Sequence, residues 1–197
     1  MAQGRGRHRS LSRSAGAARY EGQLVEGKAH GHGRRTYKNG SAYEGEWLHG
    51  LRHGNGKLAG EGCRFSYDGQ WQEDERHGEG CCSYANGTEY VGQWYESQRQ
   101  GNGTCTYASG VTYEGQWQGD AYHGQGRRCY RDGSSYEGQW RAGEAHGRGK
   151  CIYSDGSSYN GEWLRDMRHG VGREAKASGG AEVERRYLND RVVRITG

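Results

Sequence analysis

The sequence predicts an all-β protein, an elongated single-layer antiparallel sheet of tandem β-hairpins. Gly accounts for 38 of the 197 residues and Pro is absent, and the scarcity of Leu, Ile, Val and Phe excludes a conventional two-layer core. The 15 Tyr and 6 Trp residues nevertheless indicate order, since disordered chains contain few aromatic residues. A motif with strand-like alternation recurs about every 23 residues, which is the pattern of a repeat protein.

Residues 1–19 precede the repeats and are predicted to form a basic disordered tail. Their arginines alternate with Gly, Ser and Ala, and anionic lipid headgroups attract such charges. The candidate lipid-binding residues are therefore Arg5, Arg7, Arg9, Arg13 and Arg19. No apolar segment of a secretory signal is visible near the start, so we expect a cytoplasmic protein with reduced cysteines.

Residues 20–181 are predicted to form seven repeat units. Each unit opens on a tyrosine, and six of the units carry a tryptophan four residues later. The openings are Tyr20, Tyr43, Tyr67, Tyr90, Tyr113, Tyr136 and Tyr159. The second half of each unit reads His-Gly-x-Gly, with Gln100 in place of His in the fourth unit. Most units end on Asn-Gly, Asp-Gly or Ser-Gly, which favours a tight turn into the next hairpin.

Each opening alternates with the period of two that defines a β-strand. Tyr113, Gly115 and Trp117 therefore share one face, and the polar side chains between them lie on the other. A buried Tyr or Trp removes roughly 150–250 Å² from water, which is worth several kcal/mol per unit at about 25 cal/mol/Å². A stack of seven hairpins, unlike a single hairpin, is then expected to be stable.

The turn at 131–133 predicts how neighbouring strands pair. A three-residue turn with glycine in the left-handed position places Gly124 opposite Trp140, whereas a two-residue turn would place Gln125 there. We favour the three-residue turn because the indole can then lie over bare glycine backbone.

Two segments depart from the pattern. The second unit is one residue longer and residues 60–65 replace its turn. Residues 182–197 are interpreted as a C-terminal degenerate half-repeat or cap, with Tyr187 near the tryptophan place and more aliphatic residues than elsewhere. Terminal repeats are commonly atypical because one side lacks a neighbour. This end is therefore a candidate surface for self-association.

The motifs at 113–117, 123–126 and 132–133 read Tyr-Glu-Gly-Gln-Trp, His-Gly-Gln-Gly and Asp-Gly. Recurring in phase, they resemble the MORN repeat, or "membrane occupation and recognition nexus", family. The resemblance implies linked β-hairpins in a rod-like sheet that often dimerises near its C-terminus. It also implies scaffolding or docking in cilia and flagella, as in radial-spoke-head-like proteins, or in cytoskeletal assemblies, and a proposed binding of phospholipids.

No catalytic residues, cofactor or metal site are predicted. Cys82, Cys105 and Cys151 occupy equivalent places, but equivalent strands lie about 10 Å apart, too far for a disulfide or for shared zinc ligation. The histidines of the His-Gly-x-Gly motifs are separated by the same distance, so they are not expected to share a metal ion either. The net charge of +4 is mild, so we expect no nucleic-acid partner.

The aromatic face is the candidate partner-binding surface. Its rings line one side of a sheet that has nothing else in the sequence to cover it, and such a face suits a partner helix or an extended peptide. The candidate residues are Tyr90, Trp94, Tyr113, Trp117, Tyr136, Trp140, Tyr159 and Trp163. The alternatives are that these rings pack only on one another and on glycine, or that they contact lipid acyl chains.

The sequence therefore predicts a non-catalytic scaffold or docking protein, in a ciliary, flagellar or other cytoskeletal assembly. A homodimer formed through the C-terminal end is a further expectation. The alternative is a peripheral membrane module that binds acidic phospholipids through its arginines.

Overall fold

The structure, a computed structural model, describes residues 18–61 and 63–193. Within these residues the chain forms sixteen β-strands and no helix, and inside each of the two units described below the strands pair antiparallel with their neighbours in sequence. The predicted fold class is confirmed, because the chain is an all-β protein of tandem hairpins. The described residues divide into two compact units, before and after the boundary between residues 98 and 99, which are described in turn.

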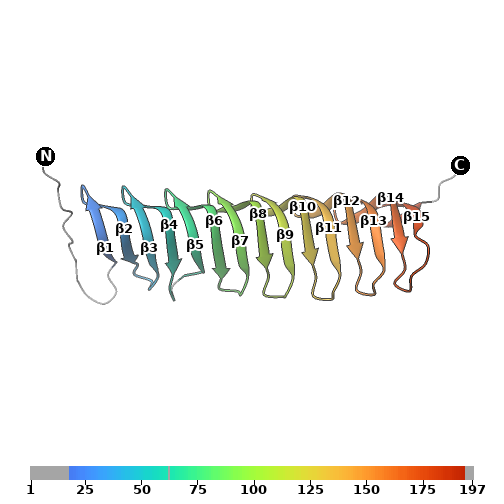
Figure 1. Cartoon of the computed structure of the whole chain (residues 1–197), viewed down its shortest axis with the longest axis horizontal. Coiled ribbons are helices and arrows are strands. Elements are labelled where there is room, and N and C mark those ends of the chain that lie inside the picture. The colour runs from blue at the N-terminus through green and yellow to red at the C-terminus, as the bar shows by residue number, and fades with distance from the viewer. Residues whose placement is uncertain (1–17, 62, 194–197) are drawn as a thin grey trace. The chain divides into compact units, whose positions relative to one another are not determined.

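The first unit is a single-layer meander in which each strand pairs with the next (Figure 1, blue to green). Its strands are β1 (Arg19–Val25), β2 (Lys28–Thr36), β3 (Ala42–Leu48), β4 (Leu51–Ala59), β5 (Phe65–Gln72), β6 (Glu75–Tyr84) and β7 (Glu89–Tyr95).

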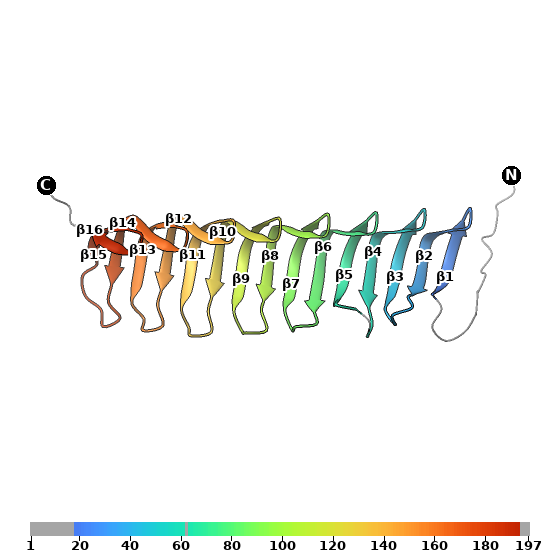
Figure 2. The same ribbon diagram turned by 180° about the vertical axis from the view of Figure 1, so that it is seen from behind.

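The second unit repeats this meander and adds one hairpin after the last aromatic repeat, which ends on the strand β16 labelled in Figure 2. Its strands are β8 (Gln98–Thr106), β9 (Thr112–Gln118), β10 (Ala121–Cys129), β11 (Ser135–Arg141), β12 (Glu144–Ile152), β13 (Ser158–Leu164), β14 (Met167–Ala175), β15 (Val183–Leu188) and β16 (Arg191–Val193).

The turn between β10 and β11 has the predicted form. Gly133 has a φ of +86° and donates its N–H to the carbonyl of Tyr130 at 3.1 Å, while Tyr130 donates to the carbonyl of Ser134 at 2.9 Å. This three-residue loop with a left-handed glycine is a favoured hairpin connection. It pairs Gly124 with Trp140, so the predicted register is confirmed.

The glycine that lies beneath a ring differs from the expectation. A Cβ on Gly126 would lie 2.3 Å from Tyr113 Oη, so the phenol ring, rather than an indole, covers bare backbone. Gly124 has a φ of +56°, and a Cβ there would meet the Gln116 amide. Glycine opposite Trp140 is therefore required by the left-handed backbone. The indole Nε1 of Trp140 instead donates to the carbonyl of Gly126 at 3.0 Å.

The core consists mainly of the repeated rings packed edge to face. Tyr113 lies 5.0 Å from Trp117 in its own hairpin and 5.5 Å from Trp140 in the next, centroid to centroid. Its hydroxyl donates to the carbonyl of Gln116 at 2.8 Å, which satisfies the buried phenol. These T-shaped pairs are worth about 0.5–1.5 kcal/mol each beyond the area they bury.

Tyr187 continues the aromatic core into the C-terminal hairpin. It pairs with Gly170, which is the position that a tryptophan occupies in the preceding repeats, and its ring lies 5.3 Å from that of Tyr159. Among the described residues, none forms a helix that could cross a lipid bilayer.

Candidate functional site

The eight rings of the predicted partner-binding surface are buried by their own sheet. Their side chains are between 0% and 8% exposed, and Trp163 is the most exposed of the tryptophans. In the second compact unit Tyr136 lies 4.9 Å from Trp140 and 5.1 Å from Trp163. In the first compact unit Tyr90 lies 5.0 Å from Trp94. The binding role of these rings stays a prediction, but the aromatic face is covered rather than bare.

Two columns of residues form this cover. The first, here called the covering position, immediately precedes the His-Gly-x-Gly motif and contains Ala29, Arg52, Arg76, Arg99, Tyr122, Ala145 and Arg168. The second column, here called the turn position, belongs to the next repeat along the chain and lies three residues after the core Trp or Tyr of that repeat. It contains Gly50, Asp74, Ser97, Asp120, Gly143, Asp166 and Asp190. Each covering residue faces the turn residue of the unit that follows it.

An arginine at the covering position clamps the next unit. Arg52 donates from Nε to Asp74 Oδ1 at 2.8 Å and from Nη2 to the Asp74 carbonyl at 2.7 Å. Its guanidinium carbon lies 4.1 Å from the centroid of Trp71, within the range of a cation–π contact.

The same arrangement recurs where serine replaces the aspartate. Arg76 donates from Nη2 to the Ser97 carbonyl at 2.7 Å, and its guanidinium lies 4.0 Å from the Trp94 ring. At Arg76 the clamp therefore uses the turn carbonyl and the ring, and where the turn residue is an aspartate its carboxylate adds a charge-assisted bond.

Two units without a covering arginine fill its place with another side chain. Beside Ala29, Arg35 from β2 reaches across, and its guanidinium lies 4.5 Å from the Trp47 ring. At Tyr122, the phenol lies 5.2 Å from the Trp140 ring, centroid to centroid. In both units the facing turn residue is a glycine, which has no carboxylate to pair.

The sixth unit is different, because nothing replaces the arginine. Ala145 is too short to reach the Trp163 ring as an arginine would, and Asp166 remains at the turn position, where its Oδ1 accepts the Ala145 backbone N–H at 2.7 Å. Among the described residues, no arginine or lysine forms an ion pair with Asp166, and none lies over Trp163. The space left is an open groove of about 580 Å³, here called the Ala145 groove.

Side chains from the fifth, sixth and seventh repeats and from the C-terminal half-repeat line the groove. They are Arg128, Tyr130, Ser134, Tyr136, Ala145, Cys151, Tyr153, Trp163, Asp166, Arg168 and Asp190. Only Tyr136 and Trp163 belong to the predicted binding residues. The others were missed because they occupy non-motif positions, although comparing the units column by column would have shown an aspartate without its arginine.

Asp166 and Arg128 are the two charged side chains of the groove that form no ion pair among the described residues. Arg128 has a buried Nε without a hydrogen-bond partner, and its guanidinium lies 4.7 Å from the Tyr130 ring. Arg168 is already engaged, since it donates to Asp190 at 3.0 Å and to Glu174 at 2.9 Å.

The phenols and the thiol of the groove are neutral at physiological pH. Burial raises the pKa of Tyr153 to about 12, and the nearby Cys151 adds to this rise. Burial also raises the pKa of Tyr130, against the opposing charge of Arg128, and the pKa of the Cys151 thiol. The groove therefore offers hydrogen-bonding hydroxyl groups and apolar ring faces, with Asp166 and Arg128 as its unpaired charges.

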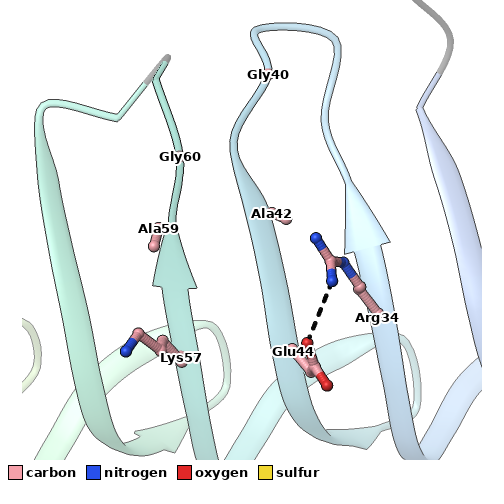
Figure 3. Close-up of a pocket in the computed structure, with 7 residues that line it drawn as sticks. All are labelled: Arg34, Gly40, Ala42, Glu44, Lys57, Ala59 and Gly60. Atoms are coloured by element: carbon pink, nitrogen blue, oxygen red, sulfur yellow. Dashed lines mark hydrogen bonds and ion pairs between the residues drawn. The ribbon is translucent and has the colours of Figure 1, made fainter.

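A second hollow, of about 350 Å³, lies over β2, β3 and β4 of the first compact unit (Figure 3). Arg34 points at Glu44, with 3.5 Å between Nη1 and Oε2, and Lys57 pairs with Asp68 at 3.5 Å. These side chains are more than half exposed and already paired, so the hollow offers a ligand little unsatisfied chemistry.

The remaining predicted positions carry no assembled site. Arg5, Arg7, Arg9 and Arg13 lie outside the described residues, and Arg19 pairs with Glu21. All six cysteines fall within the described residues, and none of them forms a disulfide there. The part of the chain that the structure describes holds no cluster of three metal-ligating side chains.

The hairpins of successive repeats share an aromatic core, and the side chains that cover this core are interrupted at one groove. This architecture defines a β-hairpin repeat protein of the scaffold or binding-module class. The chain belongs to the MORN repeat family, a family of non-enzymatic repeat scaffolds. Its repeat matches residues 20–42, 43–62, 67–89, 90–112, 113–135, 136–158 and 159–181.

No curated protein matches the chain. Among solved structures, it is similar to the SAS-4 (dCPAP) TCP domain in complex with a proline-rich motif of Ana2 (dSTIL) of Drosophila melanogaster. The two share 14% sequence identity over 89% of this chain and 96% of that chain, with a TM-score of 0.49.

Proposed function

We propose that this protein is a non-catalytic scaffold that docks a protein partner, and that an extended segment of the partner lies in the Ala145 groove. The observation that supports docking is the interrupted cover over Trp163. Apolar rings lie beside a carboxylate and a guanidinium that have no ion-pair partner, and peptide-binding sites combine such rings with a few fixed polar groups. An open groove of about 580 Å³ is of the size that holds a few side chains.

An extended segment suits this site better than a helix. The groove crosses several strands and is open to solvent, and its unpaired groups are single donors and acceptors rather than a continuous apolar stripe. A helix would require apolar contacts at three- and four-residue spacing along a longer surface. The groove of one interrupted unit offers a few side-chain positions instead.

The proposed setting is a cytoplasmic assembly of a cilium, a flagellum or the wider cytoskeleton, as for radial-spoke-head-like scaffolds. The seven MORN repeats support this through the family resemblance. Proximity labelling with the tagged full-length chain, read together with microscopy, tests the setting. Labelled proteins without any ciliary or cytoskeletal component would contradict it.

Binding of acidic phospholipids through the arginines remains the alternative. Co-sedimentation with vesicles containing a phosphoinositide tests it, and the bound fraction is expected to fall with salt if the arginines carry the binding. Binding that is the same with and without the anionic lipid would exclude this alternative.

The C-terminal hairpin is the proposed surface of a homodimer. Leu188 is 54% exposed and Val192 is 52% exposed, and β16 pairs only with β15 among the described strands. An exposed edge strand with apolar side chains can pair with a second copy. Sedimentation equilibrium of the wild type and of Val192→Lys tests this, and a monomer at all concentrations would contradict it.

Photo-crosslinking tests the docking role directly. A benzoylphenylalanine in place of Tyr153 stands in the groove, and the matched control places it at Tyr107, the equivalent residue of a unit whose cover is complete. We expect a defined partner segment, identified by mass spectrometry, from position 153 only. A synthetic copy of that segment should then bind the purified chain. Equal crosslinking from both positions, or none from 153, would contradict docking in the groove.

A further inference from the structure

We infer that the Ala145 groove is an acceptor site for an arginine side chain of the docked partner. The partner's guanidinium would occupy the place that the chain's own arginines fill in other units. This assignment rests on the proposed docking function and specifies the chemistry of the partner.

The chain itself supplies the template for this contact. Arg52 and Arg168 each place Nε on Oδ1 of the next turn aspartate, at 2.8 Å and 3.0 Å. Each guanidinium also lies against the ring that precedes that aspartate by three residues, and for Arg168 this is Tyr187 at 4.6 Å. The aspartate and the ring thus form a two-part receptor for a guanidinium.

The pairing between the two columns identifies the exception. Where the covering residue is arginine, the turn residue is aspartate or serine, and where it is Ala29 or Tyr122, the turn residue is glycine. The sixth unit alone combines a covering alanine with a turn aspartate, Asp166. Its receptor is therefore built without the side chain that fills it elsewhere.

Neighbouring side chains do not complete this receptor. Arg168 pairs with Asp190 and Glu174, and Arg128 lies over Tyr130. Arg128 carries no ion pair among the described residues, but its Nε is buried within the chain, so this side chain does not take the place of a partner guanidinium at Asp166.

Arginine fits this receptor better than lysine does. The planar guanidinium can donate to Asp166 in its plane while its face lies on the Trp163 indole. An ammonium group can approach the carboxylate or the ring, but it lacks the planar fork that satisfies both at once.

The test uses the full chain labelled with 5-fluorotryptophan and fluorine NMR. The probe is acetyl-Gly-Arg-Gly-amide, and its matched control replaces arginine with citrulline, which has nearly the same shape but no charge. We expect the arginine peptide to shift the Trp163 resonance, assigned with Trp163→Phe, and the citrulline peptide to bind about tenfold more weakly or less. Equal shifts from both peptides would overturn the assignment.

A second measurement supplies the guanidinium from within the chain. Ala145→Arg should rebuild the clamp, raise the Tm by about 2–4 °C and abolish the peptide-induced shift. The gain in Tm should disappear when Asp166→Asn is added. An Ala145→Arg protein that gains no stability, or that still binds the arginine peptide, would overturn the assignment even if the variant folds normally.

These outcomes separate the arginine assignment from the docking role. A partner captured from position 153 whose binding survives removal of every arginine leaves docking intact and overturns the arginine site. Specific arginine-peptide binding without any captured partner supports the receptor and contradicts the docking role.

Discussion

Arg52 donates from its Nε to Asp74 Oδ1 at 2.8 Å, across the boundary between two successive repeats. The same carboxylate oxygen accepts the Arg52 backbone N–H at 2.9 Å, so one turn residue holds both the main chain and the side chain of its neighbour. In a repeat array each unit contacts chiefly the units beside it. A clamp of this kind therefore contributes to the coupling that makes the units fold together.

Removing this clamp should destabilise the protein measurably. Arg52→Ala loses the contact with the Trp71 ring and leaves Asp74 without its cation, and the arginine side chain is only 19% exposed. We expect a loss of about 1–2 kcal/mol in the free energy of unfolding, measured by urea denaturation. The matched control is Arg34→Ala, whose exposed pair with Glu44 should contribute less than about 0.5 kcal/mol. Equal losses would show that the covering column is not special.

Gly126→Ala should lower the free energy of unfolding more than a glycine substitution that introduces backbone strain alone. The new Cβ would lie 2.3 Å from Tyr113 Oη, and the buried ring must move, so we expect a loss of about 1–3 kcal/mol or more. Gly143→Ala is the control, because its Cβ meets nothing within 4 Å at a φ of +88°. Because of the left-handed backbone alone, that substitution should lower the free energy of unfolding by about 1 kcal/mol. Urea denaturation of both variants decides whether ring-over-glycine packing adds to backbone strain.

The local parts of the fold could be predicted because they depend on neighbouring residues. The left-handed Gly133 fixes the turn, and the turn fixes which residue lies opposite Trp140. The glycine beneath a ring was assigned to the wrong partner, because the bulge between β9 and β10 shifts the register inside the hairpin. No residue in the sequence marks that bulge as clearly as Asp132-Gly133 marks the turn.

The candidate site could be predicted only in part. Tyr136 and Trp163 were named from their motif positions, but Ala145, Asp166 and Arg128 were not. Contacts between successive units depend on the twist of the sheet and on rotamers of long arginines, which strand periodicity does not specify. The aromatic face was therefore expected to be bare, whereas Arg52, and other arginines like it, cover it.

Stability should fall at high pH because buried phenols resist ionisation. The pKa of Tyr153 is about 12 in the folded chain, from a usual 10.0, so the unfolded chain releases this proton at lower pH than the folded chain does. The free energy of unfolding should thus be unaffected below about pH 9 and decline between about pH 10 and 12. Tyr153→Phe should show a smaller decline. Tyrosinate absorbance of the folded protein checks the cause, and titration of every phenol near pH 10 would contradict it.

The strongest check on the interrupted cover compares two aspartates in identical turns. Asp120 and Asp166 have φ values of +66° and +65°, and each accepts the backbone N–H of the facing covering residue. Asparagine tolerates this left-handed backbone and keeps the acceptor oxygen, so Asp→Asn removes only the charge.

Asp120 also pairs with Arg99 at 2.8 Å, whereas Asp166 has no such ion pair among the described residues. Asp120→Asn should therefore cost about 1 kcal/mol and Asp166→Asn less than about 0.5 kcal/mol in urea denaturation. Equal costs would mean that Asp166 already has a partner that satisfies its charge, and the groove would then have no carboxylate to offer an arginine.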